Sequence, residues 1–123
     1  MSDAFLPFEK LEVHELSVEF AVKVYHLTRD FPEAERFGLT NQLRRAAVSI
    51  SLNIAEGRGR STAKEFARFL TIARGSLFEV MSGARIATEL ELMTVQDQQL
   101  LRSMANKLNA KLMALLKSLD NSV

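Results

Sequence analysis

The sequence contains no cysteine and no tryptophan among its 123 residues, and only two prolines and five glycines. Without cysteine the chain has no disulfide framework, no thiol nucleophile and no cysteine-ligated metal. Pro7 and Pro32 both lie in the first third, so residues 33–123 lack the residue that most strongly interrupts helices. Uncharged apolar runs extend over only a few residues, which is too short to span a membrane, and no secretory signal opens the chain. We therefore expect a soluble, cytoplasmic protein.

The length and the hydrophobic content favour one folded domain. A chain of this size can bury roughly two-thirds of its unfolded surface without disulfides or metals, and a hydrophobic fraction of 47% is too high for a disordered chain. No repeat or low-complexity stretch divides the sequence. The prediction is a single domain over residues 1–123, with frayed ends at about 1–7 and 121–123.

Charge is balanced overall but unevenly distributed. The net charge is +1, yet residues 1–35 carry three Lys/Arg against eight Asp/Glu, and residues 36–85 carry nine against three. Residues 86–123 carry four of each sign. This asymmetry indicates either an acidic surface that docks on a basic one, or a basic surface that binds a polyanion.

Apolar residues recur at helical spacing in four segments, and no segment of any length alternates like a strand. The expected helices cover about residues 11–29, 40–56, 62–90 and 94–119. Thr40, Thr62 and Thr94 are expected N-caps, Glu65 completes a capping box with Thr62, and Gly57 is expected to end the second helix. Short connections between long helices make them antiparallel neighbours. The sequence thus predicts an all-α fold, an antiparallel up-and-down four-helix bundle.

The first expected helix has two apolar faces instead of one. One is the expected core face, and the other lies nearly opposite, with the acidic strip Glu12, Glu15 and Glu19 between them. Two faces indicate either a second contact in a homo-oligomer, which we favour, or a helix deeply enclosed by its own bundle. The core face comprises Val13, Leu16, Phe20, Val24 and Leu27, and the second face comprises Leu11, Val18, Val22 and Tyr25.

The second expected helix carries a polar stripe between two apolar faces, of which the smaller is formed by Val48, Leu52 and Ala55. Such a stripe should be partly buried, so its members must satisfy one another or groups on a facing helix. Glu56 lies where the helix dipole disfavours an anion, so we expect a cationic partner from another helix or subunit, and Glu79 is an expected partner for an arginine. The stripe is interpreted as a buried network that sets helix register, or alternatively as a ligand or partner site. Its members are Gln42, Arg45, Ser49, Asn53 and Glu56.

The third and fourth expected helices have one core face each. On the third helix, Phe66 and Phe69 are expected core aromatics. Its small residues Gly75, Ser76 and Gly83 indicate close approach to another helix, because a mid-helix glycine costs about 1 kcal/mol relative to alanine. The core stripe of the fourth helix comprises Leu100, Leu101, Met104, Leu108, Leu112, Leu115 and Leu119.

No catalytic or cofactor-binding motif occurs in the chain. The two histidines, His14 and His26, are twelve residues apart on one expected helix and point in different directions. His26 and Asp30 have a ligand-compatible spacing, but two ligands make an incomplete metal site. We therefore expect no enzymatic activity, no cofactor and no metal.

The best candidate for anion binding is the loop GRGRS at residues 57–61, which leads into the third helix. Flexible glycines, two arginines and free helix amides can together hold a phosphate. The alternative is a solvated loop. Because no aromatic residue alternates with these arginines, binding to RNA or DNA would be directed at the backbone and sensitive to salt. The candidate residues are Arg44, Arg58, Arg60, Lys64 and Arg68.

Several motifs follow one another in the middle of the chain: FPEAERFGLT (31–40), QLRRAAVSI (42–50), NIAEG (53–57), KEF (64–66), FL (69–70) and IARGSL (72–77). Over about residues 8–92 this string resembles the 23S rRNA intervening-sequence protein family, also called the S23 or four-helix-bundle family. The resemblance implies a four-helix bundle assembled as a ring-like homopentamer. It also implies relatedness to the accessory variability protein of diversity-generating retroelements, a basic pentamer that binds nucleic acid and a reverse transcriptase.

Two functional hypotheses follow. The first is a homo-oligomeric helical scaffold whose basic surface binds RNA or DNA. The second is a protein–protein interaction module without nucleic-acid binding, in which the basic segment meets the acidic first helix of a neighbouring subunit.

Overall fold

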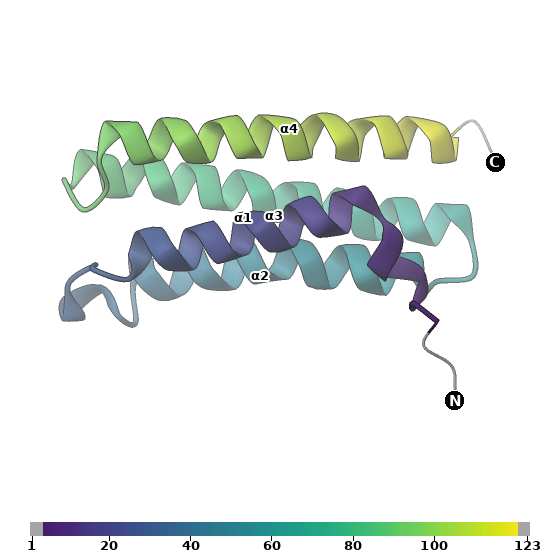
Figure 1. Ribbon diagram of the computed structural model, residues 1–123, viewed down its shortest axis with the longest axis horizontal. Helices are drawn as coiled ribbons and strands as arrows, with labels where there is room; N and C mark the ends of the chain where they lie inside the picture. Colours follow the sequence, from purple (N-terminus) through teal and green to yellow (C-terminus); the bar gives the residue numbers. More distant parts are fainter. Residues whose placement is uncertain (1–3, 121–123) are drawn as a thin grey trace.

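The computed structural model of the chain describes residues 4–120 and consists of four long helices lying side by side (Figure 1). Each helix packs against two others, α1 on α2 and α4, and α3 on α2 and α4. The described residues contain no strand, which confirms the all-α four-helix bundle. Within that range no helix is both long enough and apolar enough to cross a membrane. The elements are the 3-10 turn η1 (Pro7–Lys10), α1 (Glu12–Thr28), the 3-10 turn η2 (Glu33–Glu35), α2 (Leu39–Arg58), α3 (Ala63–Glu89) and α4 (Val95–Asp120).

The helix starts follow the capping residues in two of three cases. The hydroxyl of Thr62 accepts a hydrogen bond from the Glu65 amide at 3.1 Å, and that of Thr94 accepts one from the Asp97 amide at 3.0 Å. These bonds satisfy amides that have no partner inside the helix. Both expected caps are confirmed.

The start and end of α2 differ from the prediction. The helix begins at Leu39, and its first amide donates to a carboxylate oxygen of Glu35 at 3.0 Å. A side chain from the preceding turn therefore takes the capping role that was wrongly assigned to Thr40. At the other end the helix continues through Gly57 to Arg58, so Gly57 does not terminate it.

The predicted core faces of α1, α2 and α3 are confirmed, with Phe20, Ile50 and Leu70 completely buried. On α4 the prediction is wrong at Leu100, which is 45% exposed. The core-facing arc of this helix is centred on Leu101, Leu108 and Leu112, and Leu100 lies beyond its edge. The core stripe predicted for α4 therefore includes one residue, Leu100, that does not face the core.

Two glycines allow α2 and α3 to approach closely. A Cβ atom on Gly57 would lie 2.6 Å from Cβ of Phe69, and one on Gly83 would lie 2.7 Å from Cδ2 of Leu43. Both distances are shorter than an ordinary carbon–carbon contact, so a Cβ at Gly57 would displace Phe69 at its own Cβ, and one at Gly83 would displace the end of the buried Leu43 side chain. Gly75, in contrast, has no heavy atom within 4 Å of such a Cβ. The predicted close approach to another helix is therefore confirmed at Gly83. At Gly75 it is wrong, because no other helix of the described chain lies near this residue.

The turn η1 packs on both α1 and α2. The ring of Phe8 meets the imidazole of His14 edge to face, with centroids 4.7 Å apart. Burial lowers the pKa of His14 below its ordinary value, and the nearby Glu9 carboxylate partly opposes this shift. A neutral imidazole suits the contact with Phe8, so η1 is held on the α1–α2 side of the bundle. Of the predicted frayed ends, 1–3 and 121–123 lie outside the described residues, 4–6 have no regular secondary structure, and Pro7 begins η1.

A pair of glycine substitutions tests the α2–α3 contact. Gly57→Ala should destabilise the fold by about 1–3 kcal/mol, because the methyl group overlaps Phe69 in a packed contact. Gly75→Ala should stabilise it by about 0.5–1 kcal/mol, since the methyl group meets open space and alanine favours the helix. Thermal unfolding followed by circular dichroism measures both effects. If both substitutions changed the melting temperature in the same direction, the different packing described for Gly57 and Gly75 would be contradicted.

Candidate functional site

The helices α1 and α2 together present an exposed apolar face, defined here by Val18, Val22, Tyr25, Val48 and Leu52. Leu52 is 63% exposed, the three α1 residues are each more than two-fifths exposed, and Val48 is half-buried. The hydroxyls of Ser17 on α1 and Ser51 on α2 form a hydrogen bond of 2.8 Å. This bond fixes the two helices relative to each other along their length. The second apolar faces predicted for both helices therefore form one surface. Leu11 does not join it, because it packs against the core.

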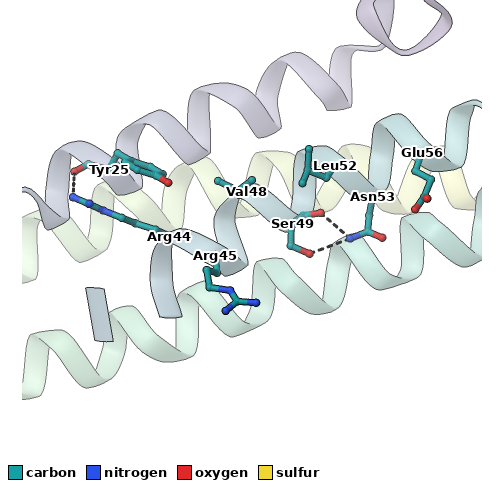
Figure 2. A pocket seen from close by; sticks show the side chains of 8 residues that line it. All are labelled: Tyr25, Arg44, Arg45, Val48, Ser49, Leu52, Asn53 and Glu56. Carbon is teal, nitrogen blue, oxygen red and sulfur yellow. Dashed lines mark hydrogen bonds between the residues drawn. The ribbon is translucent and has the colours of Figure 1, made fainter. Parts of the chain in front are cut away.

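A cavity of about 650 Å³ opens on this face. Figure 2 shows that its two arginines diverge: Arg44 turns toward Tyr25 of α1, and Arg45 turns toward α3. The cavity therefore has one arginine on its α1 side and one on its α3 side, with Val48 and Leu52 contributing apolar lining. Its lining residues are Tyr25, Arg44, Arg45, Val48, Ser49, Leu52, Asn53 and Glu56.

Arg44 ties α2 to α1. Its Nε donates to the Thr28 hydroxyl at 2.9 Å, and its guanidinium lies 4.6 Å from the centroid of the Tyr25 ring. Arg44 and Arg58 are fourteen residues apart on one helix, which is about 21 Å along the axis. Arg44 therefore lies apart from the loop arginines and contacts α1, so the structure does not bring it together with the other candidate cations.

The centre of the polar stripe forms a hydrogen-bonded network with α3. The hydroxyls of Ser49 and Ser76 lie 3.0 Å apart, and the Asn53 amide donates to the backbone oxygen of Ser49 at 2.8 Å and to its hydroxyl at 3.0 Å (Figure 2). Ser49 and Asn53 are half-buried and Ser76 is buried. The predicted network is confirmed at these residues.

The rest of the stripe is exposed, so its predicted burial is wrong for the single chain. Gln42, Arg45, Glu56 and Glu79 are all exposed, because the stripe faces solvent beside α3 instead of lying beneath it. Glu56 pairs with Arg60, four residues on, at 3.4 Å, and not with an arginine of another helix. Arg45 and Glu79 line a second cavity, of about 350 Å³, but among residues 4–120 neither forms an ion pair.

The basic end of the bundle, formed by Arg58, Arg60, Lys64 and Arg68, is built around an aromatic ring. The guanidiniums of Arg60 and Arg68 lie 4.9 and 4.8 Å from the centroid of Phe69. Phe69 is buried, as expected for a core aromatic, and the two guanidiniums lie against its ring. Phe69 follows Arg68 directly in the sequence, but only the turn between α2 and α3 brings Arg60 to the same ring.

The four cations of the basic end have different environments. Arg60 pairs with Glu56, and Arg68 pairs with Glu65 at 3.3 Å. Both pairs are substantially exposed, so each contributes little to stability. Arg58 and Lys64 are exposed, and neither forms an ion pair within the described chain. These two residues therefore supply the unneutralised charge of the basic end.

Between Ala4 and Asp120, no group of three or more His, Cys, Asp or Glu residues is arranged to hold a metal ion. The candidate chemistry of the described surface accordingly lies in its apolar face, its polar stripe and its basic end.

These features define the class of protein: a four-helix bundle with an amphipathic open cavity on two of its helices. The chain belongs to the 23S rRNA-intervening sequence protein family, whose model matches residues 9–114. It is also similar in structure to a protein of unknown function from the S23 ribosomal protein family of Bacteroides thetaiotaomicron. The two share 24% sequence identity with a TM-score of 0.76, covering 85% of this chain and 98% of that one. No curated protein sequence matches the chain.

A serine substitution tests the network at the α2–α3 contact. Ser76→Ala removes the α3 partner of Ser49 and should destabilise the fold by about 0.5–1.5 kcal/mol, the net value of a partly buried hydrogen bond. Ser82→Ala, on the exposed side of the same helix, should change stability by less than about 0.5 kcal/mol. Urea unfolding curves measure the difference. Equal effects would show that the hydrogen bond adds nothing to the contact.

Proposed function

We propose that the protein is a non-enzymatic scaffold that assembles with copies of itself through the apolar face of α1 and α2. The observation that carries the proposal is the contiguous exposure of Val18, Val22, Tyr25 and Leu52 on one side of a well-packed bundle. Soluble monomers rarely leave such side chains together in water, and full burial of one is worth about 1.5–3 kcal/mol. Contact with another copy removes this surface from solvent.

The size of the assembly is proposed to be a homopentamer, because the resemblance to the family implies a ring of five. The unpaired charge of Arg45, beside a cavity of about 650 Å³, supports a contact on this side of the bundle. A charged side chain at the edge of an apolar contact contributes to partner choice and orientation more than to affinity. A protein–protein interaction module without nucleic-acid binding is the alternative within the same proposal.

Binding of RNA or DNA is a second proposed activity, and a specific feature of the basic end favours it. Its four cations outnumber the two adjacent carboxylates, Glu56 and Glu65, and Arg58 and Lys64 have no acidic partner in the described chain. Phe69 holds two guanidiniums at one place. A ring would repeat this surface in every subunit, which strengthens attraction to a polyanion through multivalency.

The assembly is tested by placing a charge in the apolar face. Leu52→Glu should shift the protein toward the 13.8 kDa monomer, because a carboxylate would have to be desolvated in the contact. Light scattering coupled to size-exclusion chromatography gives the mass. Val95→Glu is the matched control, since Val95 is similarly exposed but lies at the start of α4. A monomeric wild-type chain would overturn the proposal.

Nucleic-acid binding is tested by titrating labelled single-stranded RNA and duplex DNA over a salt series, with fluorescence anisotropy as the readout. Binding should weaken steeply with salt, and Arg58→Ala/Lys64→Ala should weaken it for every sequence and lower the salt slope by about one to two units. Arg102→Ala/Lys107→Ala, on the exposed side of α4, is the control of equal charge. Absence of binding at low salt would leave the interaction module as the remaining function.

A further inference from the structure

A second apolar feature lies on the α3–α4 side of the bundle. A groove of about 760 Å³ runs between the beginning of α3 and the end of α4. This volume is within the range of cavities that enclose a small ligand or a few side chains. Three exposed charged residues, Lys64, Lys117 and Asp120, also line it. The apolar lining consists of Ala63, Ala67, Met113, Ala114, Leu116 and Leu119.

A matching pair of apolar side chains lies on the other side of the molecule. Phe5 and Leu6, called the arm here, precede η1 and are 63% and 57% exposed. The backbone of Leu6 is extended, with φ −70° and ψ 154°, as is usual for a residue before proline. In Figure 1 the chain before Pro7 leaves the bundle beside α2, away from α4. The arm therefore lies on the side opposite the groove.

The arm and the groove occur at the same end of the bundle, where α2 turns into α3 and α4 ends (Figure 1). Because they lie on opposite sides, two copies placed side by side in the same orientation bring the arm of one next to the groove of the other. Such a contact joins two different surfaces, and heterologous contacts of this kind form a ring when the rotation from one copy to the next closes. The arrangement thus fits a cyclic assembly.

We propose that Phe5 and Leu6 of one copy insert into the α3–α4 groove of a neighbouring copy. This inference rests on the proposed self-assembly and names a second contact that contributes to it. The charges next to the arm complement those of the groove: Glu9 and Lys10 follow the arm, while two lysines and one aspartate line the groove. Burial of a phenylalanine and a leucine removes exposed apolar surface from both partners.

A peptide titration tests the fit directly. The probe is a fluorescein-labelled peptide of residues 1–11, added to the full-length variant Phe5→Ser/Leu6→Ser so that no intact arm competes. We expect saturable binding by anisotropy, weakened at least tenfold when Ala67→Glu or Met113→Glu is added to that variant. Met113 is partly exposed, so its replacement should leave the fold intact. The matched control is Val95→Glu, which should leave peptide affinity unchanged.

The assembly itself provides the second readout. By light scattering, Phe5→Ser/Leu6→Ser should lower the mass of the wild-type assembly at micromolar concentration, and Met113→Glu should do the same. Absence of peptide binding, or equal binding with and without Met113→Glu, would overturn the inference. Peptide binding combined with an unchanged mass would also overturn it, because insertion of the arm would then contribute nothing to the assembly.

The two proposals fail in different ways. If Leu52→Glu disperses the assembly while the arm and groove variants do not, the proposed self-assembly through α1 and α2 is supported and the proposed insertion of the arm is wrong. Suppose instead that Leu52→Glu leaves the mass unchanged, the arm variant lowers it and the peptide binds. Assembly then depends on the arm, and the proposal that the apolar face of α1 and α2 forms the contact is wrong.

Discussion

The close contact between α2 and α3 is the constraint on which the rest of this structure depends. Gly57 against Phe69 and Gly83 against Leu43 leave no room for a Cβ atom, so the two helices meet backbone to side chain at both ends of their contact. This fixes the rotation of α2 about its axis. With Leu43 and Ile54 directed into the core, Leu52 and Arg45 must point outward. The exposed apolar face and the open polar stripe both follow from that rotation.

Charged and exposed apolar side chains differ in whether they find partners within the chain. Most described ion pairs join residues three or four positions apart, as in Arg60–Glu56 and Arg68–Glu65, so these charges are paired locally along the chain. Exposed apolar side chains have no such local remedy, because neighbours on the same face of a helix cannot bury one another. The exposed groups that lack a local partner on α1 and α2 are therefore apolar.

The sequence predicts a helix cap correctly where the capping side chain bonds to an amide in its own turn of helix. Thr62 and Thr94 cap the helices that follow them, since the hydroxyl and the amide it accepts are only three residues apart. Thr40 does not cap α2 because the helix already begins at Leu39, whose amide donates to the Glu35 carboxylate of the preceding turn. The stacking of Arg60 and Arg68 on Phe69 could not be foreseen, because it depends on how the α2–α3 turn folds back.

The sequence alone determined the helical period, the number of helices, their core faces and the family to which the chain belongs, because these depend on residue spacing and residue type. It also located the polar stripe on α2. Only the tertiary structure decided which of its members are buried, as Ser49 and Asn53 are, and which are exposed, as Arg45 and Glu56 are. Exposure depends on where the neighbouring helices end and how closely they approach. Spacing along one helix contains no information about that distance.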